Sequence, residues 1–380
     1  MKSKKSIIEK INCHIISLMI LMNSIQIIIA WDFGLTFNMW LEYVLIIILF
    51  IINKFKMVNT KNIIIIGTTC LLFAINFICN DNQTLRFYIK EFLLFALPLL
   101  LIFLVKVDLK TFAKTFFGYN VVNLILYLLL IKINPSKLTT EYMTFGFYAM
   151  SSLTYVMLYA YYHKYIKTFI VSLLVLLIIV INGNRGTIMI FGVALICMLL
   201  MNGKNIRKKI LMVSLLILIG ININTIGRSI LVFLTEDLGI KSYSINNLYR
   251  MFESEDTEDA LGARYDIYQY AIEEIKTHPI TGIGIAKFQD KYGYFPHNIF
   301  LDIYVTFGFV LGNAYIIYLV WLGIKLYKIA RISTEIKIFF IFMVANVSKL
   351  LLSRTFIYEP TIWLFISLGN YILCFNNKKQ

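Results

Sequence analysis

The sequence predicts an all-α protein that crosses a membrane many times and carries one long external loop with an amphipathic helix. Hydrophobic residues make up 59% of the 380 residues, and charged residues make up only 15%. Soluble domains are about 45–50% apolar and roughly 25% charged, so this composition is typical of proteins embedded in lipid. Apolar runs of about 17–25 residues recur along the chain, and each could cross a ~30 Å hydrocarbon core as a helix.

About twelve membrane helices are expected from these runs. They cover residues 11–30, 38–53, 62–79, 88–105, 116–133, 143–161, 166–182, 186–202, 209–227, 298–324, 334–352 and 358–375. The second range is short, and the fourth has Arg86 just before it and Lys90 and Glu91 near its start. No linker or low-complexity tract interrupts the sequence, so residues 1–380 are expected to form a single integral membrane domain.

The distribution of charge predicts the orientation in the membrane. In a soluble protein, a net charge of +15 would favour nucleic acid as a partner. Here the basic residues are concentrated in alternate loops between the apolar runs, as in a membrane protein. If the N-terminus is cytoplasmic, 22 of the 36 Lys and Arg residues fall in inner loops or at the two ends. Residues 228–297 hold seven Lys/Arg against eleven Asp/Glu. Because positive charge accumulates inside, we expect two cytoplasmic termini, a large external loop at 228–297 and no nucleic-acid partner.

The basic, apolar N-terminus also fits the pattern of a signal peptide. No small-x-small cleavage site precedes Trp31, and the run is long enough to span, so an uncleaved first helix is favoured. The five cysteines lack CxxC or zinc spacing, and the acidic run 253–259 lacks the ligand spacing of a calcium loop. We therefore expect no disulfide, no metal and no cofactor.

Within the external loop, the pattern predicts a helix from Asp259 to Thr277. Asp259 can cap its start, and Pro279 stops it. Ile267, Ala271 and Ile275 recur every four residues, which gives the helix one apolar stripe. An amphipathic segment too polar to span favours a helix that lies on the membrane surface.

Three polar side chains are expected on the outer face. Arg264 lies one turn before the stripe, and it could instead be an ordinary solvent-exposed arginine. Arg185 lies in the outer turn 182–186 at the start of the next helix, and it could instead bind lipid phosphate. His297 begins an apolar run on the same face. Imidazole has a pKa of about 6.5 and can accept a proton near neutral pH, although a lone histidine is more often structural. Together these groups suit an anionic, lipid-linked substrate.

The order of motifs resembles the bacterial family of O-antigen ligases and O-antigen or capsular polysaccharide polymerases. Arg185-Gly opens a helix, and Gly-x-Arg264 precedes the external helix. His-Pro-Ile-x-Gly-Ile-Gly-x-x-x-Phe then spans 278–288, His-Asn-x-x-Leu spans 297–301, and Phe-Gly-x-x-x-Gly spans 307–312. The resemblance covers roughly residues 170–325. Family members usually carry Trp where this chain has Tyr268, so the position stays aromatic.

The resemblance implies transfer of a glycan from undecaprenyl diphosphate at the outer leaflet. Arg185 and Arg264 would bind the departing diphosphate, because guanidinium groups grip phosphate oxygens in pairs. His297 would deprotonate the acceptor hydroxyl on a second lipid-linked unit. Arg354 would bind the diphosphate or a sugar. Further substrate-binding positions are Asn298 and Tyr268.

The resemblance also implies a cellular setting, and it leaves several alternatives open. The protein would lie in the bacterial plasma membrane, with membrane lipid, a flippase and a chain-length regulator as partners. Glu359 or Asp302 could orient the histidine. A polymerase is favoured over a ligase that uses another acceptor. A flippase for lipid-linked oligosaccharide and a glycosyltransferase with a carboxylate base at Asp32 are rival functions, but the basic cluster lies on one face, and the loop at Asp32 offers no second acid.

Overall fold

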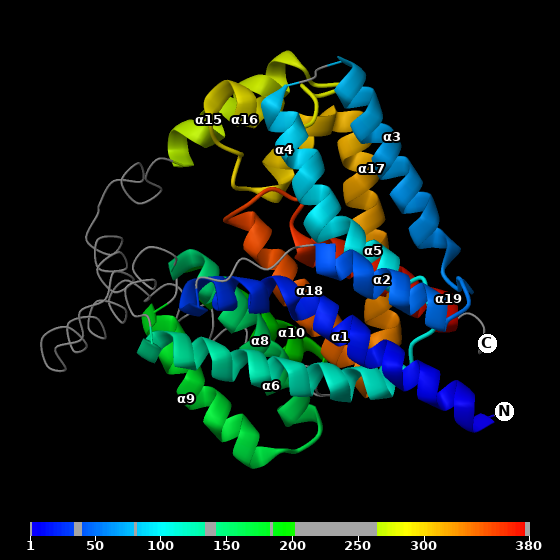
Figure 1. Cartoon of the computed structure of the whole chain (residues 1–380). Helices are drawn as coiled ribbons and strands as arrows, with labels where there is room; N and C mark the ends of the chain where they lie inside the picture. Colours follow the sequence, from blue (N-terminus) through cyan, green and yellow to red (C-terminus); the bar gives the residue numbers. More distant parts are fainter. Residues whose placement is uncertain are drawn as a thin grey trace, which may run out of the picture.

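The computed structural model describes residues 2–33, 40–79, 82–133, 142–182, 185–201 and 264–376, and within these ranges the chain is helical without strands (Figure 1). The first half contains α1 (Lys2–Phe33), α2 (Trp40–Ile52), α3 (Thr60–Cys79), α4 (Gln83–Glu91), the π-helix η1 (Phe92–Ala96), α5 (Leu97–Ile102), α6 (Leu109–Ile133), α8 (Tyr142–Tyr162), α9 (Ile166–Asn182) and α10 (Arg185–Met201). The second half contains α15 (Arg264–Thr277), α16 (Lys287–Tyr292), α17 (Ile299–Ala330), α18 (Thr334–Ser348), the 3₁₀ turn η3 (Lys349–Leu351) and α19 (Pro360–Asn376).

Two groups of helices meet at α18. On one side α1 packs along α6, α6 along α8, and α8 along α9 and α10, while α10 packs against α18. On the other side α17 and α19 pack against α18, and α15 lies on α17 (Figure 1). Aromatic rings fill the junction, where the Phe112 and Phe339 rings stack at 4.9 Å and the Phe116 and Tyr155 rings meet edge to face at 4.5 Å. Such ring pairs add to the stabilisation from burial alone.

The start of α1 and the end of α19 are bound to one turn. Asn12 of α1 donates a hydrogen bond from Nδ2 to the Lys106 carbonyl at 2.8 Å. Tyr371 of α19 donates from its hydroxyl to the Val107 carbonyl and accepts from the Val107 amide, both at 2.7 Å. The first and the last helix of the chain are therefore attached at the same side of the molecule.

Most predicted apolar ranges are helices in the structure. Eleven of the twelve overlap a described helix, and the range 209–227 lies outside the described residues. Within the described part, α3, α6 and α17 are long and apolar enough to cross a membrane. The described part of the chain is therefore all-helical with three such candidate spans, and the count of about twelve membrane helices stays a prediction.

The fourth predicted range differs most from a simple membrane helix. Its helix begins earlier, at Gln83, because the Asn82 side chain caps it by accepting from the Leu85 amide at 2.7 Å. It then passes through the π-helix η1 before α5 begins next to Pro98. A proline lacks the amide hydrogen and crowds the carbonyl four residues earlier, which is the physical reason for the wider turn.

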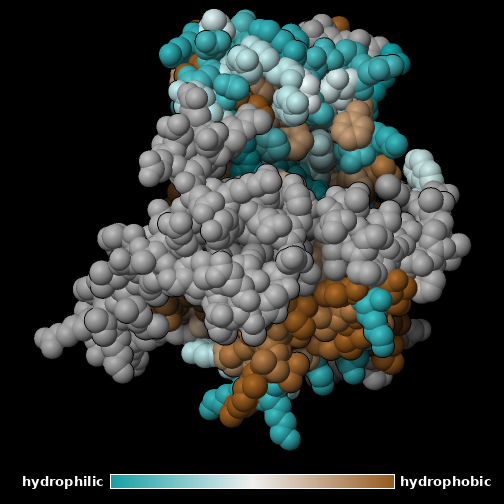
Figure 2. Space-filling model, turned by 90° about the vertical axis from the view of Figure 1, so that its left-hand side faces the viewer, coloured by the Kyte–Doolittle hydropathy of each residue, from teal (hydrophilic) through white to brown (hydrophobic). Residues whose placement is uncertain are grey.

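Hydrophilic residues gather at the end of the molecule that carries α15 and α16. Figure 2 shows this end coloured as hydrophilic, with an apolar flank beneath it. Asp259 and residues up to 263, which the sequence placed in the external helix, lie outside the described residues; the described helix runs from Arg264 to Thr277 and ends before Pro279.

Candidate active site

The apolar stripe of α15 packs against protein. Ile267 and Ala271 are 6% and 0% exposed and form a small core with Phe288 of α16 and Val305 of α17, with Ile275 beside it. The apolar stripe is therefore covered by α16 and α17 and does not face lipid, and the position of α15 on the membrane surface stays a prediction. The burial fixes α15, and with it Arg264, relative to α17.

Two glycines bring residues 279–284 into contact with α17. Three backbone hydrogen bonds of 2.7–3.1 Å join residues 279–284 to residues 305–309. Gly308 interrupts the helix there with φ 65° and ψ −172°, and Gly282 has φ 67°. A Cβ atom on Gly308 would lie 2.4 Å from the Ile280 backbone, and one on Gly282 would lie 2.6 Å from the Gly308 amide nitrogen. Only glycine fits both the backbone angles and the space.

A buried carboxylate joins α15 to α16. Glu274 is 6% exposed and accepts hydrogen bonds from Lys291 Nζ at 2.5 Å and from the Tyr292 hydroxyl at 2.7 Å, with His278 Nδ1 at 3.5 Å. Burial alone would raise the pKa of Glu274, but the bonds from Lys291 and Tyr292 outweigh it and hold the pKa below its usual value. His278 of the His-Pro motif therefore contributes to this junction.

Polar contacts also attach residues 285–290 to α3 and α4. Asp290 accepts hydrogen bonds from Asn82 Nδ2 at 3.0 Å and from the Thr84 hydroxyl at 2.8 Å. Asn76 of α3 accepts from the Ile285 amide through Oδ1 at 2.9 Å. The described part of the predicted external loop is thus held by three helices, so it can present side chains with fixed geometry.

His297 ends this segment in a conformation that few residues adopt. Its φ is 53°, in the left-handed region, and the ring lies 4.4 Å from the ring of Phe295. Asn298 follows as the cap of α17, where its Oδ1 accepts from the Phe300 amide at 2.9 Å and from the Leu301 amide at 3.3 Å. Strained backbone conformations of this kind are frequent at functional sites.

The imidazole of His297 is held in its neutral form. Burial, and to a smaller extent the positive charge of Arg264, together lower its pKa to about 4. The Nδ1 atom is buried without a hydrogen-bond partner in the described part of the chain. The structure thus brings Arg264 and His297, separated by 33 residues in sequence, into one electrostatic environment. At neutral pH the imidazole is unprotonated, so one ring nitrogen can accept a proton, and the lowered pKa makes it a weaker base than an ordinary histidine.

A second charged cluster lies on the turn between α18 and α19. The Glu359 carboxylate, 1% exposed, pairs with Lys349 Nζ at 2.6 Å and with Arg354 at 3.4 Å. Arg354, at φ 66°, also donates to the hydroxyl of Tyr148 on α8. The Glu359 carboxylate is thus shared by two cations, and Glu91 of α4 also lies within electrostatic range of Arg354.

The first turn of α17 connects His297 to this cluster. Asp302 is 4% exposed and accepts from the Phe356 amide at 3.1 Å, two residues after Arg354. The carboxylates of Asp302 and Glu359 are thus occupied by Phe356 and by the two cations. No contact between either acid and His297 is found in the described structure, so the expectation that one of them orients the imidazole gains no support.

The remaining predicted residues have varied settings. Arg185 is the first residue of α10, and its side chain lies outside what the structure describes. Tyr268 is half-buried on α15, and the Oδ1 atom of Asn298 is used for capping. The acidic run 253–259 lies outside the described residues; within them, no group of three His, Cys, Asp or Glu could hold a metal.

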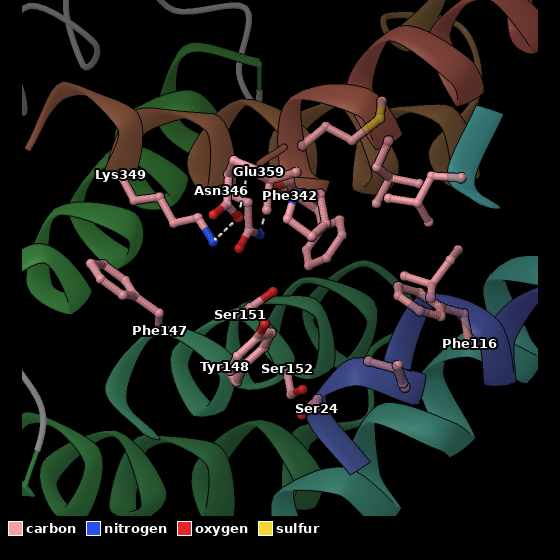
Figure 3. A pocket seen from close by; sticks show the side chains of 17 residues that line it. Ser24, Phe116, Phe147, Tyr148, Ser151, Ser152, Phe342, Asn346, Lys349 and Glu359 are labelled. Carbon is pink, nitrogen blue, oxygen red and sulfur yellow. Dashed lines mark hydrogen bonds and ion pairs between the residues drawn. The ribbon is translucent and has the colours of Figure 1, made fainter. Parts of the chain in front are cut away.

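Sequence reasoning did not identify Lys349. It lies within the apolar range 334–352, and a buried lysine in such a range needs a partner, which is the signal that could have drawn attention to it. Lys349 and Glu359 border a small, partly open pocket between α1, α8, α18 and α19, which Tyr148 and Asn346 also line (Figure 3).

Residues 170–316 match the family model described as O-antigen ligase. This part of the chain is therefore similar to the O-antigen ligase family. The resemblance drawn from the motifs is confirmed, and the matched range contains Arg185, Arg264 and His297, whereas Arg354 and Lys349 lie beyond it. Members of the O-antigen ligase family are glycosyltransferase-like enzymes of polysaccharide biosynthesis, which agrees with the apolar helices of a membrane protein. No curated protein and no solved structure matched the chain.

Proposed function

We propose that this protein is a polymerase of surface polysaccharide. It transfers a glycan from undecaprenyl diphosphate to a lipid-linked repeat unit at the outer leaflet of the bacterial plasma membrane. The carrying observation is the pair formed by Arg264 and His297, in which burial and the guanidinium charge keep the imidazole neutral. A neutral imidazole with an unpartnered Nδ1 suits a general base, and a neighbouring guanidinium suits a phosphate.

The steps follow from these two groups. His297 takes the proton of the acceptor hydroxyl as its oxygen attacks the anomeric carbon of the donor. The bond from that carbon to the diphosphate breaks, and the electron pair leaves with the diphosphate. Arg264 stabilises this growing charge, together with Arg185, and Arg354 supplies a further cation at the edge of the site.

The orientation and partners form part of the proposal. Attachment of α1 and α19 to the turn 106–108 supports termini on one side of the membrane, and the charge distribution favours the cytoplasmic side. A polymerase transfers the glycan to a second lipid-linked unit, whereas the alternative, a ligase, transfers it to another acceptor. The expected protein partners are a flippase and a chain-length regulator.

Replacing Arg264 with lysine tests catalysis against transport. Lysine keeps the charge but loses the two-pronged contact with phosphate, which is worth on the order of 2–4 kcal/mol in a water-poor site. We expect glycan extension to slow by roughly 30- to 1,000-fold. Single repeat units should still be found on the lipid carrier at the outer face, where an impermeant sugar-modifying reagent reaches them.

The matched control is Lys276→Arg, an exchange of cations at an exposed position of the same helix, which should leave extension unchanged. Repeat units that accumulate out of reach of the reagent in the Arg264→Lys strain would instead identify the protein as a flippase. Normal extension in that strain would remove Arg264 from the mechanism.

The pH dependence follows from the lowered pKa of His297. The base acts only when unprotonated, so a pKa of about 4 leaves it competent throughout the neutral range and inactivates it only as the pH falls towards 4. We expect the acid limb of kcat/KM for the reconstituted protein to lie near pH 4. An acid limb near 6.5, the value of an unperturbed imidazole, would contradict the buried environment of His297.

A further inference from the structure

An apolar, partly open cavity of about 220 Å³ lies between α3, α17 and α19. Figure 1 shows α3 along the edge of the molecule with α17 beside it. Ile65, Thr69 and Leu72 of α3 form one wall, and rings of the other two helices, among them Phe307 and Trp363, face them. An engineered apolar cavity of about 150 Å³ stays dry and binds benzene. Because an apolar wall offers water no hydrogen bonds, hydrocarbon is the expected occupant here.

The polar side chains in the wall offer an occupant a single free group. The hydroxyls of Thr68 and Thr69 donate to carbonyls four residues earlier at 2.9 and 2.8 Å, and the Trp363 indole donates to a backbone carbonyl at 2.8 Å. The Tyr318 hydroxyl accepts from a side-chain amide of α19 at 2.8 Å. Among the described lining residues, only Tyr315 has a buried hydroxyl without a partner. An occupant should therefore be apolar along its length and carry one hydrogen-bond acceptor.

Basic residues surround the end of the cavity nearest the start of α3. Lys61 lies one turn before Ile65, and its Nζ lies 5.9 Å from the centre of the Trp321 ring on α17. Residues 53–62 and 318–331, which lead to this end, hold six Lys or Arg and no Asp or Glu. Basic pockets between membrane helices bind anionic lipid headgroups, and tryptophan is frequent at the membrane interface. This end therefore suits a phosphate.

These three features favour a phospholipid over the isoprenoid carrier. An acyl chain ends in an ester, whose carbonyl can accept from Tyr315, whereas an isoprenoid chain contains no acceptor. Tyr315 lies six residues before Trp321, about 9 Å along the helix, so one molecule can reach both its hydroxyl and Lys61. Arg354 at the other end does not line the cavity, because it pairs with Glu359.

We propose that this cavity binds one acyl chain of an anionic bilayer phospholipid, with Tyr315 donating to the ester carbonyl and Lys61 pairing with the headgroup phosphate. Ile285 also lines the cavity, and its amide donates to Asn76 of α3 at 2.9 Å. The bound chain therefore braces α3 and the segment that leads to His297. The proposal goes beyond the proposed function, because binding requires neither a glycan nor a residue of the reaction.

The test measures lipid binding to the full chain in detergent after its own lipid has been removed. Thr69→Trp fills the cavity, and its control is Ile64→Trp, at a position of α3 that is 67% exposed and does not line the cavity. Lys61→Gln removes the cation, and its control is Lys167→Gln, an exposed lysine at the start of α9. The probes are dioleoyl phosphatidylglycerol, dioleoyl phosphatidylcholine and undecaprenyl phosphate, and native mass spectrometry counts the bound molecules.

We expect the wild type to bind one phosphatidylglycerol more tightly than phosphatidylcholine. Thr69→Trp should weaken phosphatidylglycerol binding by about 10-fold, because the ring displaces methylene groups of the chain. Lys61→Gln should weaken it by roughly fivefold and leave phosphatidylcholine binding unchanged, since one lysine is lost. Both control variants should bind like the wild type. If Thr69→Trp does not fold, the loss of headgroup preference in Lys61→Gln decides the question.

Three results would overturn the proposal. One is equal binding of phosphatidylglycerol by the wild type and the two cavity variants, and another is an equal loss in the control variants. The third is undecaprenyl phosphate that displaces phosphatidylglycerol from the wild type but binds poorly to Thr69→Trp, which would assign the cavity to the carrier lipid. Because no glycan is present, none of these outcomes depends on His297 or on transfer.

Discussion

Replacing His297 with alanine should abolish polymer formation while the protein remains inserted and abundant. The imidazole is the proposed base, and its removal takes away the group that accepts the proton of the attacking hydroxyl. Loss of a general base typically slows a reaction by roughly 100- to 10,000-fold, which is enough to remove long chains from a gel of surface glycan. Immunoblotting of the membrane fraction checks the amount of protein.

Two further variants separate chemistry from backbone strain. His297 has φ 53°, which alanine tolerates poorly, whereas asparagine adopts such angles readily but has no base. His297→Asn should therefore be as inactive as His297→Ala but better folded. His278→Ala removes the other histidine of the segment, an exposed side chain 3.5 Å from Glu274, and should retain most activity. Full-length polymer from His297→Asn would remove the proposed base.

Replacing Gly308 with alanine should be among the most damaging single-methyl changes in the described structure. The new Cβ atom would lie 2.4 Å from the backbone of Ile280, and φ is 65°. Alanine in this backbone region, which is almost restricted to glycine, costs roughly 1–3 kcal/mol, and forced overpacking adds about 1–3 kcal/mol, so the junction between residues 279–284 and α17 should open. The measurement is the half-life of the detergent-solubilised protein on heating, together with extension activity.

Gly293→Ala isolates the contribution of the clash. Gly293 has a similar φ of 78°, but nothing lies within 4 Å of its missing Cβ atom. It should show only the conformational penalty, so the protein should outlast Gly308→Ala on heating and retain more activity. Equal half-lives for the two variants would mean that the contact between Gly308 and Ile280 is unimportant.

The sequence predicted those features that depend on local pattern. Apolar length predicted the helical ranges, and the spacing of Ile267 and Ala271 together with Pro279 predicted the course and end of α15. The order of the motifs indicated the family, since each glycine and histidine keeps its place along the chain. The pairing of Arg264 with His297 was expected only as a shared face, and the structure brings the two into electrostatic contact.

Features that depend on contacts between distant segments could not be predicted. In the sequence, the Gly-Ile-Gly motif and the Phe-Gly motif each look like a local turn or tail. In the structure, Gly282 and Gly308 are needed because the two segments are in backbone contact there. The stripe of α15 was assigned to lipid, since amphipathic spacing does not distinguish a bilayer from a neighbouring helix. Lys349 and Glu359 lie ten residues apart, and only the turn between α18 and α19 makes them a pair.

The central claim is that this chain alone transfers glycan between lipid-linked units with His297 as its base. The most direct measurement incubates the purified protein in lipid nanodiscs with isolated lipid-linked repeat units and follows the products by mass. We expect units of two or more repeats to form with release of one undecaprenyl diphosphate per transfer, and we expect His297→Asn to form none at comparable times. Extension by His297→Asn at the wild-type rate, or a wild type that forms no dimeric unit, would contradict the account.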